Sequence, residues 1–184
     1  MDLYLVLYLV LILVYRFAET WVMAKFGTLP RRPAKDWTAW MIIVPYWLVI
    51  VAPVLEYVAG ERQRPSTSAL TAGAALFIAA TAVRVRAHLD LGAQFSMFLE
   101  TGRSEGLVTT GLYAWIRHPL YLANLLLFLA CPTFLAVRWS WLSTAVAFVG
   151  VVTRIEIEET LLRERFDGYA EYAEGTWKLV PRLY

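Results

Sequence analysis

The stretch GLYAWIRHPLY, residues 111–121, overlaps the start of a long apolar run at residues 120–137. It places Arg117 and His118 at the boundary of a segment that is hydrophobic enough to enter a membrane. Ionisable side chains at such a boundary are costly unless they bind or pair with something. A second polar cluster, RIEIEE at residues 154–159, follows the next apolar run. Two clusters at the mouths of adjacent apolar segments predict one site at the membrane surface.

The composition indicates an integral membrane protein of one domain. Of 184 residues, 59% are hydrophobic and 17% charged, and the mean hydropathy is +0.54. Soluble domains are about 45–50% apolar and about 25% charged. The net charge of +2 is too small to indicate nucleic-acid binding. One cysteine, Cys131, and two histidines exclude a disulfide framework and a multi-histidine metal centre.

The hydropathy pattern predicts an all-α fold with about five transmembrane helices. The apolar segments cover residues 3–24, 37–59, 68–87, 119–137 and 139–153. The first three have the roughly 20 residues that a span needs, and the last two form a shorter hairpin that turns near Arg138. Within the first segment, Arg16 and Glu19 are three apart and can pair on one helical face. We treat residues 1–184 as one membrane domain, with a three-helix part at 1–90 and a site-bearing part at 91–184.

Basic residues cluster on one side of the predicted bundle. The first loop, the segment after the third span and the tail are rich in Lys and Arg, including Arg84, Arg86 and Arg117. The positive-inside rule then places the N-terminus outside and the C-terminus in the cytoplasm. We expect residues 88–117 to form an ordered loop, because apolar residues are embedded in it. From Ile155 onward, i, i+3, i+4 spacing predicts an amphipathic helix against the cytoplasmic face.

The two polar clusters have the chemistry of a site for a zwitterion. Proline is well tolerated in the first turn of a helix, so Pro119 is expected to begin the fourth span, with His118 at the N-cap. A helix N-terminus attracts carboxylates and other anions. Arg154 and Glu158 are four apart and share one helical face. Alternatively, Arg117 and His118 anchor a helix to headgroups, and the second cluster is a salt-bridged surface helix.

Residues 107–121, LVTTGLYAWIRHPLY, resemble one half of the signature of isoprenylcysteine carboxyl methyltransferases. The other half resembles the tail, in which Glu158-Glu159 is followed by Leu162, Phe166 and residues 180–182. Both halves flank a short apolar hairpin, and the resemblance covers about 90 residues. It implies a membrane-embedded enzyme that uses S-adenosylmethionine and receives a lipophilic substrate from the bilayer.

The resemblance also implies roles for particular residues. Those expected to contact the cofactor are Glu100, Leu107, Val108, Tyr113, His118, Pro119, Tyr121 and Glu158. Glu158 suits the cofactor's ammonium, while His118 and the helix N-terminus suit its carboxylate. Arg154 would face the substrate and the transferred methyl, so Arg154 and Glu158 are the expected catalytic residues. Where the family usually has a glycine after the motif's tyrosine, this chain has Ala123 and then Asn124, and we assign Asn124 to the substrate wall.

The expected acceptor is a lipophilic carboxylate or hydroxyl, with membrane lipids as surroundings and no obligate protein partner. Phospholipid N-methyltransferases share a similar RHP-x-Y motif and are the nearest alternative. A sterol-type reductase that uses NADPH and a membrane accessory protein with a degenerate pocket are further alternatives. The short chain favours a prokaryotic relative in an inner membrane, whose substrate need not be a prenylated cysteine.

Overall fold

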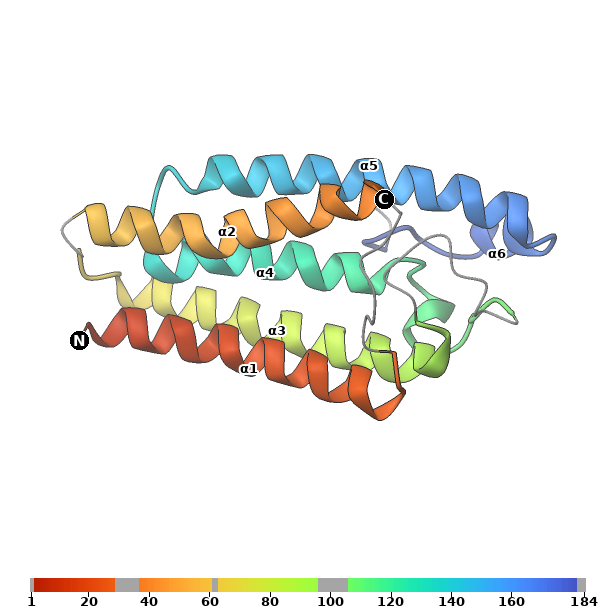
Figure 1. The fold of residues 1–184 in the computed structure, drawn as a ribbon, viewed down its shortest axis with the longest axis horizontal. Helices are drawn as coiled ribbons and strands as arrows, with labels where there is room; N and C mark the ends of the chain where they lie inside the picture. The colour runs from red at the N-terminus through yellow and green to blue at the C-terminus, as the bar shows by residue number, and fades with distance from the viewer. Residues whose placement is uncertain (1, 29–36, 61–62, 96–105, 182–184) are drawn as a thin grey trace.

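The computed structural model describes residues 2–28, 37–60, 63–95 and 106–181. These residues form an elongated helical bundle (Figure 1). The α-helices are α1 (Leu3–Lys25), α2 (Trp40–Ala59), α3 (Thr67–Leu91), α4 (Pro119–Leu135), α5 (Trp141–Arg165) and α6 (Tyr169–Glu174). Short 3-10 helices are η1 (Trp37–Ala39), η2 (Gly92–Gln94) and η3 (Gly111–Ala114). Within the described ranges the β-structure is a single bridge between Ile116 and Trp177.

Helices α1, α2 and α3 are long and apolar enough to cross a membrane. Large apolar side chains cover their outward faces, as expected for surfaces against lipid, and Phe17 for example is 73% exposed. Helix α4 has 17 residues. Helix α5 is apolar in its first half and polar in its second half. The predicted all-α membrane fold is confirmed, while crossing of the bilayer by α4 and α5 stays a prediction.

Two helices run further than the sequence predicted. Helix α3 continues past residue 87 to Leu91, and Gly92, with a φ of 57°, ends it. Arg84 was expected among the loop charges, but it lies inside α3 and is buried. The amphipathic helix expected from Ile155 is the second half of α5, because no proline or glycine interrupts the chain between residues 151 and 165.

Helix α4 lies between α3 and the α2–α5 pair (Figure 1). Its inner face, including Leu127, Phe128 and Cys131, is fully buried in the hydrophobic core. Gly73 allows the close contact of α3 with α4, since a Cβ there would lie 2.6 Å from the Cα of Phe134. This packing brings the C-terminal ends of α1, α3 and α5 to the same end of the bundle as the N-terminal ends of α2 and α4 (Figure 1).

The opposite end of the bundle is fixed by one carboxylate. Glu56, near the end of α2, accepts hydrogen bonds from the backbone N–H groups of Arg138, Trp139 and Ser140, each at 2.7 Å. These residues form the turn between α4 and α5, where Ala136 takes a left-handed conformation with a φ of 53°. The predicted hairpin turn near Arg138 is therefore confirmed, and it sets the register of α4 against α5.

Candidate active site

The segment before α4 is attached to the end of α3. Asp90 accepts a hydrogen bond from the backbone N–H of Leu112 at 2.8 Å. A Cβ on Gly111 would lie 2.3 Å from the Asp90 carboxyl, and the φ of Gly111 is 63°, so only glycine fits this position well. The Tyr172 hydroxyl donates to the carbonyl of Tyr113 at 2.6 Å. The part of the predicted ordered loop that the structure describes is thus held from two sides.

Helix α4 begins as the sequence predicted, with His118 at the N-cap and Pro119 in the first turn. The chain's C-terminal segment pairs with this corner. The backbone N–H of Arg117 donates to the carbonyl of Trp177 at 2.8 Å, and that of His118 donates to the carbonyl of Lys178 at 3.0 Å. The tail therefore fixes the direction in which the Arg117 and His118 side chains leave the backbone.

Glu159 connects the two polar clusters. Its Oε1 lies 2.8 Å from Arg117 Nε and 2.8 Å from His118 Nε2, and it accepts from the Tyr169 hydroxyl at 2.8 Å. Burial opposes ionisation of this carboxyl, but hydrogen bonds from His118, Arg117 and Tyr169 outweigh it and lower the pKa of Glu159 to about 2. The carboxylate thus joins α5, α6 and the start of α4 in one ionic cluster.

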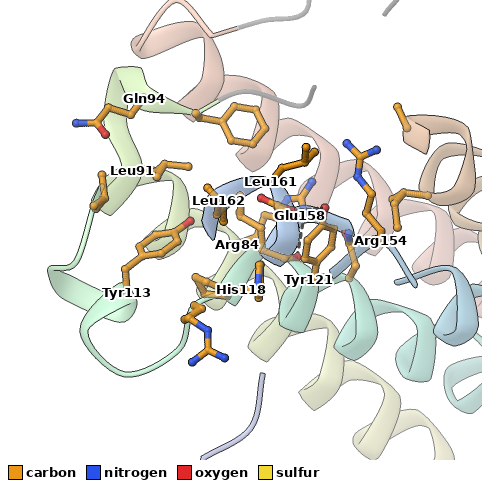
Figure 2. Close-up of a pocket in the computed structure, with 18 of the residues that line it drawn as sticks. Arg84, Leu91, Gln94, Tyr113, His118, Tyr121, Arg154, Glu158, Leu161 and Leu162 are labelled. Atoms are coloured by element: carbon orange, nitrogen blue, oxygen red, sulfur yellow. Dashed lines mark hydrogen bonds between the residues drawn. The ribbon is translucent and has the colours of Figure 1, made fainter. Parts of the chain in front are cut away.

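Glu158 takes a different partner from its neighbour. Its Oε2 accepts a hydrogen bond from the Tyr121 hydroxyl at 2.8 Å. Successive residues of a helix point about 100° apart, so Glu159 can face the α4 corner while Glu158 faces the cavity. Arg154 lies one turn earlier on α5 and is 2% exposed. Figure 2 shows Tyr121, Glu158 and Arg154 gathered on one side and Tyr113 on the other.

A cavity of about 460 Å³ lies between these elements. The predicted site residues that line it are Leu107, Val108, Tyr113, His118, Pro119, Tyr121, Asn124, Arg154 and Glu158. Glu100, the remaining predicted contact, lies outside the described residues. The two polar clusters meet, as the sequence predicted. Their roles toward a cofactor and a substrate stay predictions.

One end of the cavity has a second set of charges that the sequence did not predict as part of the site. Arg84 Nε donates to Glu19 Oε1 at 2.9 Å, and Arg16 also pairs with Glu19, as its spacing predicted. Glu19, Arg84 and Arg16 all line the cavity together with Tyr46. A glutamate inside an apolar segment requires a partner, so Glu19 is the sequence feature that could have indicated a buried cation nearby.

The phenols around the cavity act as donors. Burial raises the pKa of Tyr113 and of Tyr169, so both hydroxyls stay protonated at neutral pH. Burial also raises the pKa of Tyr172 to about 12. These tyrosines can position oxygens by hydrogen bonding but are poor proton acceptors.

Comparison with known proteins assigns this architecture. Residues 73–164 match the isoprenylcysteine carboxyl methyltransferase (ICMT) family, and the match covers half of the chain. This protein belongs to the ICMT family. The ICMT match begins within α3 and ends near the end of α5, so it includes both polar clusters and the hairpin between them. Helices α1 and α2 lie before it.

A curated relative is the cobalt-zinc-cadmium resistance protein CzcN of Cupriavidus metallidurans. It is 36% identical to this ICMT-family chain over 92 residues, which are 48% of this chain and 41% of the relative. The aligned part thus spans less than half of the relative's length. Within the described residues, no group of three or more His, Cys, Asp and Glu side chains is arranged to hold a metal ion.

Proposed function

We propose that this protein transfers a methyl group from S-adenosylmethionine to an oxygen of a lipophilic acceptor that reaches the cavity from the bilayer. The observation that carries the proposal is the cavity of about 460 Å³, which is lined by both polar clusters of the region that matches the ICMT family. That volume lies within the roughly 300–1,000 Å³ of small-molecule sites. The family is one of membrane methyltransferases, which supports the reaction type.

The residues present suit S-adenosylmethionine. The Glu158 carboxylate is half-buried, lines the cavity and is held by Tyr121, so it can bind the cofactor's ammonium. At the start of α4 the Leu120 N–H is the amide left for the carboxylate, because Pro119 has no N–H and Tyr121 donates to the His118 carbonyl at 3.1 Å. Leu107, Val108 and Leu162 supply apolar walls for the adenine. When bound, the cofactor supplies an electrophilic methyl group on a sulfonium.

The chain's own contribution to the reaction is placement. Methyl transfer is an in-line displacement, so holding donor and acceptor in contact can supply much of the rate enhancement. An acceptor carboxylate is already a nucleophile and needs no base, and the products are a neutral ester and a neutral thioether. The Arg154 guanidinium, buried beside Tyr121, can orient such a carboxylate by two parallel hydrogen bonds.

The membrane setting completes the proposal. Lys and Arg residues concentrate at the end of the bundle where the cavity lies, so we place this end and the C-terminus in the cytoplasm and the N-terminus outside. We expect a prokaryotic inner membrane, with lipids rather than a protein partner around α1, α2 and α3. We also propose that residues 91–184 are the part of the single membrane domain that binds the cofactor.

The test is methyl transfer by purified protein in lipid nanodiscs. The protein is given methyl-labelled S-adenosylmethionine with either N-acetyl-S-farnesylcysteine or phosphatidylethanolamine. We expect label in a base-labile ester of the carboxylate acceptor, and a loss of transfer with Arg154→Ala. Label only in the phospholipid would instead assign N-methylation, and label in neither acceptor with cofactor bound would exclude both acceptor classes.

A further inference from the structure

The guanidinium of Arg84 joins three helices at one end of the cavity. Its Nε donates to Glu19 of α1 at 2.9 Å, and its Nη1 donates to Asn124 Oδ1 of α4 at 3.0 Å and to the Leu120 carbonyl at 3.2 Å. The Arg84 side chain is 9% exposed and that of Glu19 is 2% exposed. A buried ion pair with these additional acceptors holds the Arg84 plane in one orientation.

This orientation determines which atom of Asn124 faces Arg84. A guanidinium has donors and no acceptor, so the atom of the Asn124 amide beside it must be the oxygen. The amide nitrogen therefore points away from Arg84, and Asn124 lines the cavity while being only 4% exposed. The hydrogen bond that Asn124 forms with Arg84 uses the amide oxygen and leaves the nitrogen for another partner. Asn124 thus offers a buried N–H donor to whatever enters the cavity.

A second polar atom lies close by. The Tyr46 hydroxyl is buried beside Arg16, with which it can form a hydrogen bond. Its ring packs against Phe128, with centroids 6.1 Å apart, and Phe128 is one helical turn beyond Asn124 on α4. A buried hydroxyl and an amide that both line one cavity suit a ligand with a polar group at this end.

We propose that Glu19 and Arg84 are positioning residues that turn the Asn124 amide so that its nitrogen donates a hydrogen bond to an oxygen of the methyl acceptor. This proposal rests on the proposed function and adds a device for selecting the acceptor. An oxygen nucleophile has lone pairs to spare for such a bond. An amine has only the lone pair that must attack the methyl group, so the donor favours oxygen acceptors over amines.

The sharpest test is Asn124→Asp. The aspartate has the same shape and still accepts from Arg84, but it has no N–H to offer the cavity. Binding of N-acetyl-S-farnesylcysteine and of its uncharged methyl ester is measured by calorimetry on protein saturated with S-adenosylhomocysteine. We expect about tenfold weaker binding of both probes, the loss of one buried hydrogen bond, with unchanged cofactor-product affinity and an unchanged or raised Tm.

Controls separate this role from others. Thr133→Val, which alters a hydroxyl bonded to the Leu129 carbonyl elsewhere on α4, should leave probe binding unchanged. Arg84→Lys should weaken probe binding in the natural chain but not in the Asn124→Asp background, because both changes act through one amide. If Asn124 served only to satisfy Arg84, the Asn124→Asp protein would bind both probes like the natural chain.

Each remaining outcome has one meaning. Weaker binding of the acid probe alone would show charge repulsion and overturn the proposal. Equal affinities of the natural and Asn124→Asp proteins for the probes would also overturn it, and so would a lack of probe binding by both proteins. Failure of the natural protein to bind S-adenosylhomocysteine while folded would instead overturn the proposed function.

Discussion

Removal of the Glu159 carboxylate tests how the two polar clusters are held together. Glu159→Ala deletes the group that accepts from Arg117 Nε and the Tyr169 hydroxyl and that pairs with His118 Nε2, each at 2.8 Å. The Arg117 and His118 side chains are only 7% and 3% exposed, so water cannot fully replace the lost partner. Removing one member of a buried ion pair costs about 3–5 kcal/mol.

We expect the loss in the free energy of unfolding to lie at the lower end of that range. The Arg117 guanidinium also donates to the carbonyls of Ala173 and Thr176, and it keeps these two acceptors in the variant. We therefore expect about 3 kcal/mol of destabilisation, which corresponds to about 6–12 °C in Tm for a chain of this length. Thermal unfolding in detergent, followed by tryptophan fluorescence, measures it.

The matched control is Glu164→Ala, which removes an exposed carboxylate from the same helix. Such a surface change should alter stability by less than about 0.5 kcal/mol. If Glu159→Ala melted within about 2 °C of the Glu164→Ala protein, the ionic cluster would contribute little and the reasoning would be refuted.

The same carboxyl predicts a pH dependence. The pKa of Glu159 is lowered to about 2 in the folded protein, so its stabilisation is fully present above its ordinary value of about 4.5. It is lost as the pH falls from there toward 2. The Tm difference between the natural chain and Glu159→Ala should therefore be constant above about pH 5 and shrink below it. A difference that stayed constant to pH 3 or grew would contradict the assigned ionic role.

Three further changes test the site and the packing that supports it. Glu158→Gln keeps an acceptor for Tyr121 but removes the charge, so affinity for S-adenosylhomocysteine should fall about tenfold or more by calorimetry, with Tm unchanged. Gly150→Ala places a Cβ 2.5 Å from a backbone oxygen of α2 and should lower Tm by several degrees, whereas Gly168→Ala, with open space around it, should not. Glu56→Ala leaves three backbone N–H groups of the α4–α5 turn without their acceptor and should speed hydrogen exchange there.

Local chemistry made part of the site predictable from the sequence. Within a helix, proline is well tolerated only in the first turn, so Pro119 alone predicted that His118 is the N-cap. The spacing of Arg154 and Glu158 placed both on one face of α5, and both line the cavity. The ends of the helices were harder to predict, because an apolar run locates a helical segment without showing where its backbone hydrogen bonds stop.

The contacts of α1 with α3 could not be read from the sequence. Glu19 and Arg84 are 65 residues apart, and Arg84 had the character of a basic residue flanking a span. Its burial depends on α3 continuing beyond the apolar segment and on α1 packing beside it. Likewise, the pairing of Trp177 with Trp115 and Arg117 depends on how the tail after α6 folds back, which no local pattern encodes.

The central claim is that the two halves of the signature close around one zwitterionic cofactor. Calorimetric titration of S-adenosylhomocysteine into the folded, purified protein tests it most directly. We expect saturable binding at one site per chain. A protein with an intact cooperative thermal transition that takes up neither S-adenosylhomocysteine nor S-adenosylmethionine would contradict it.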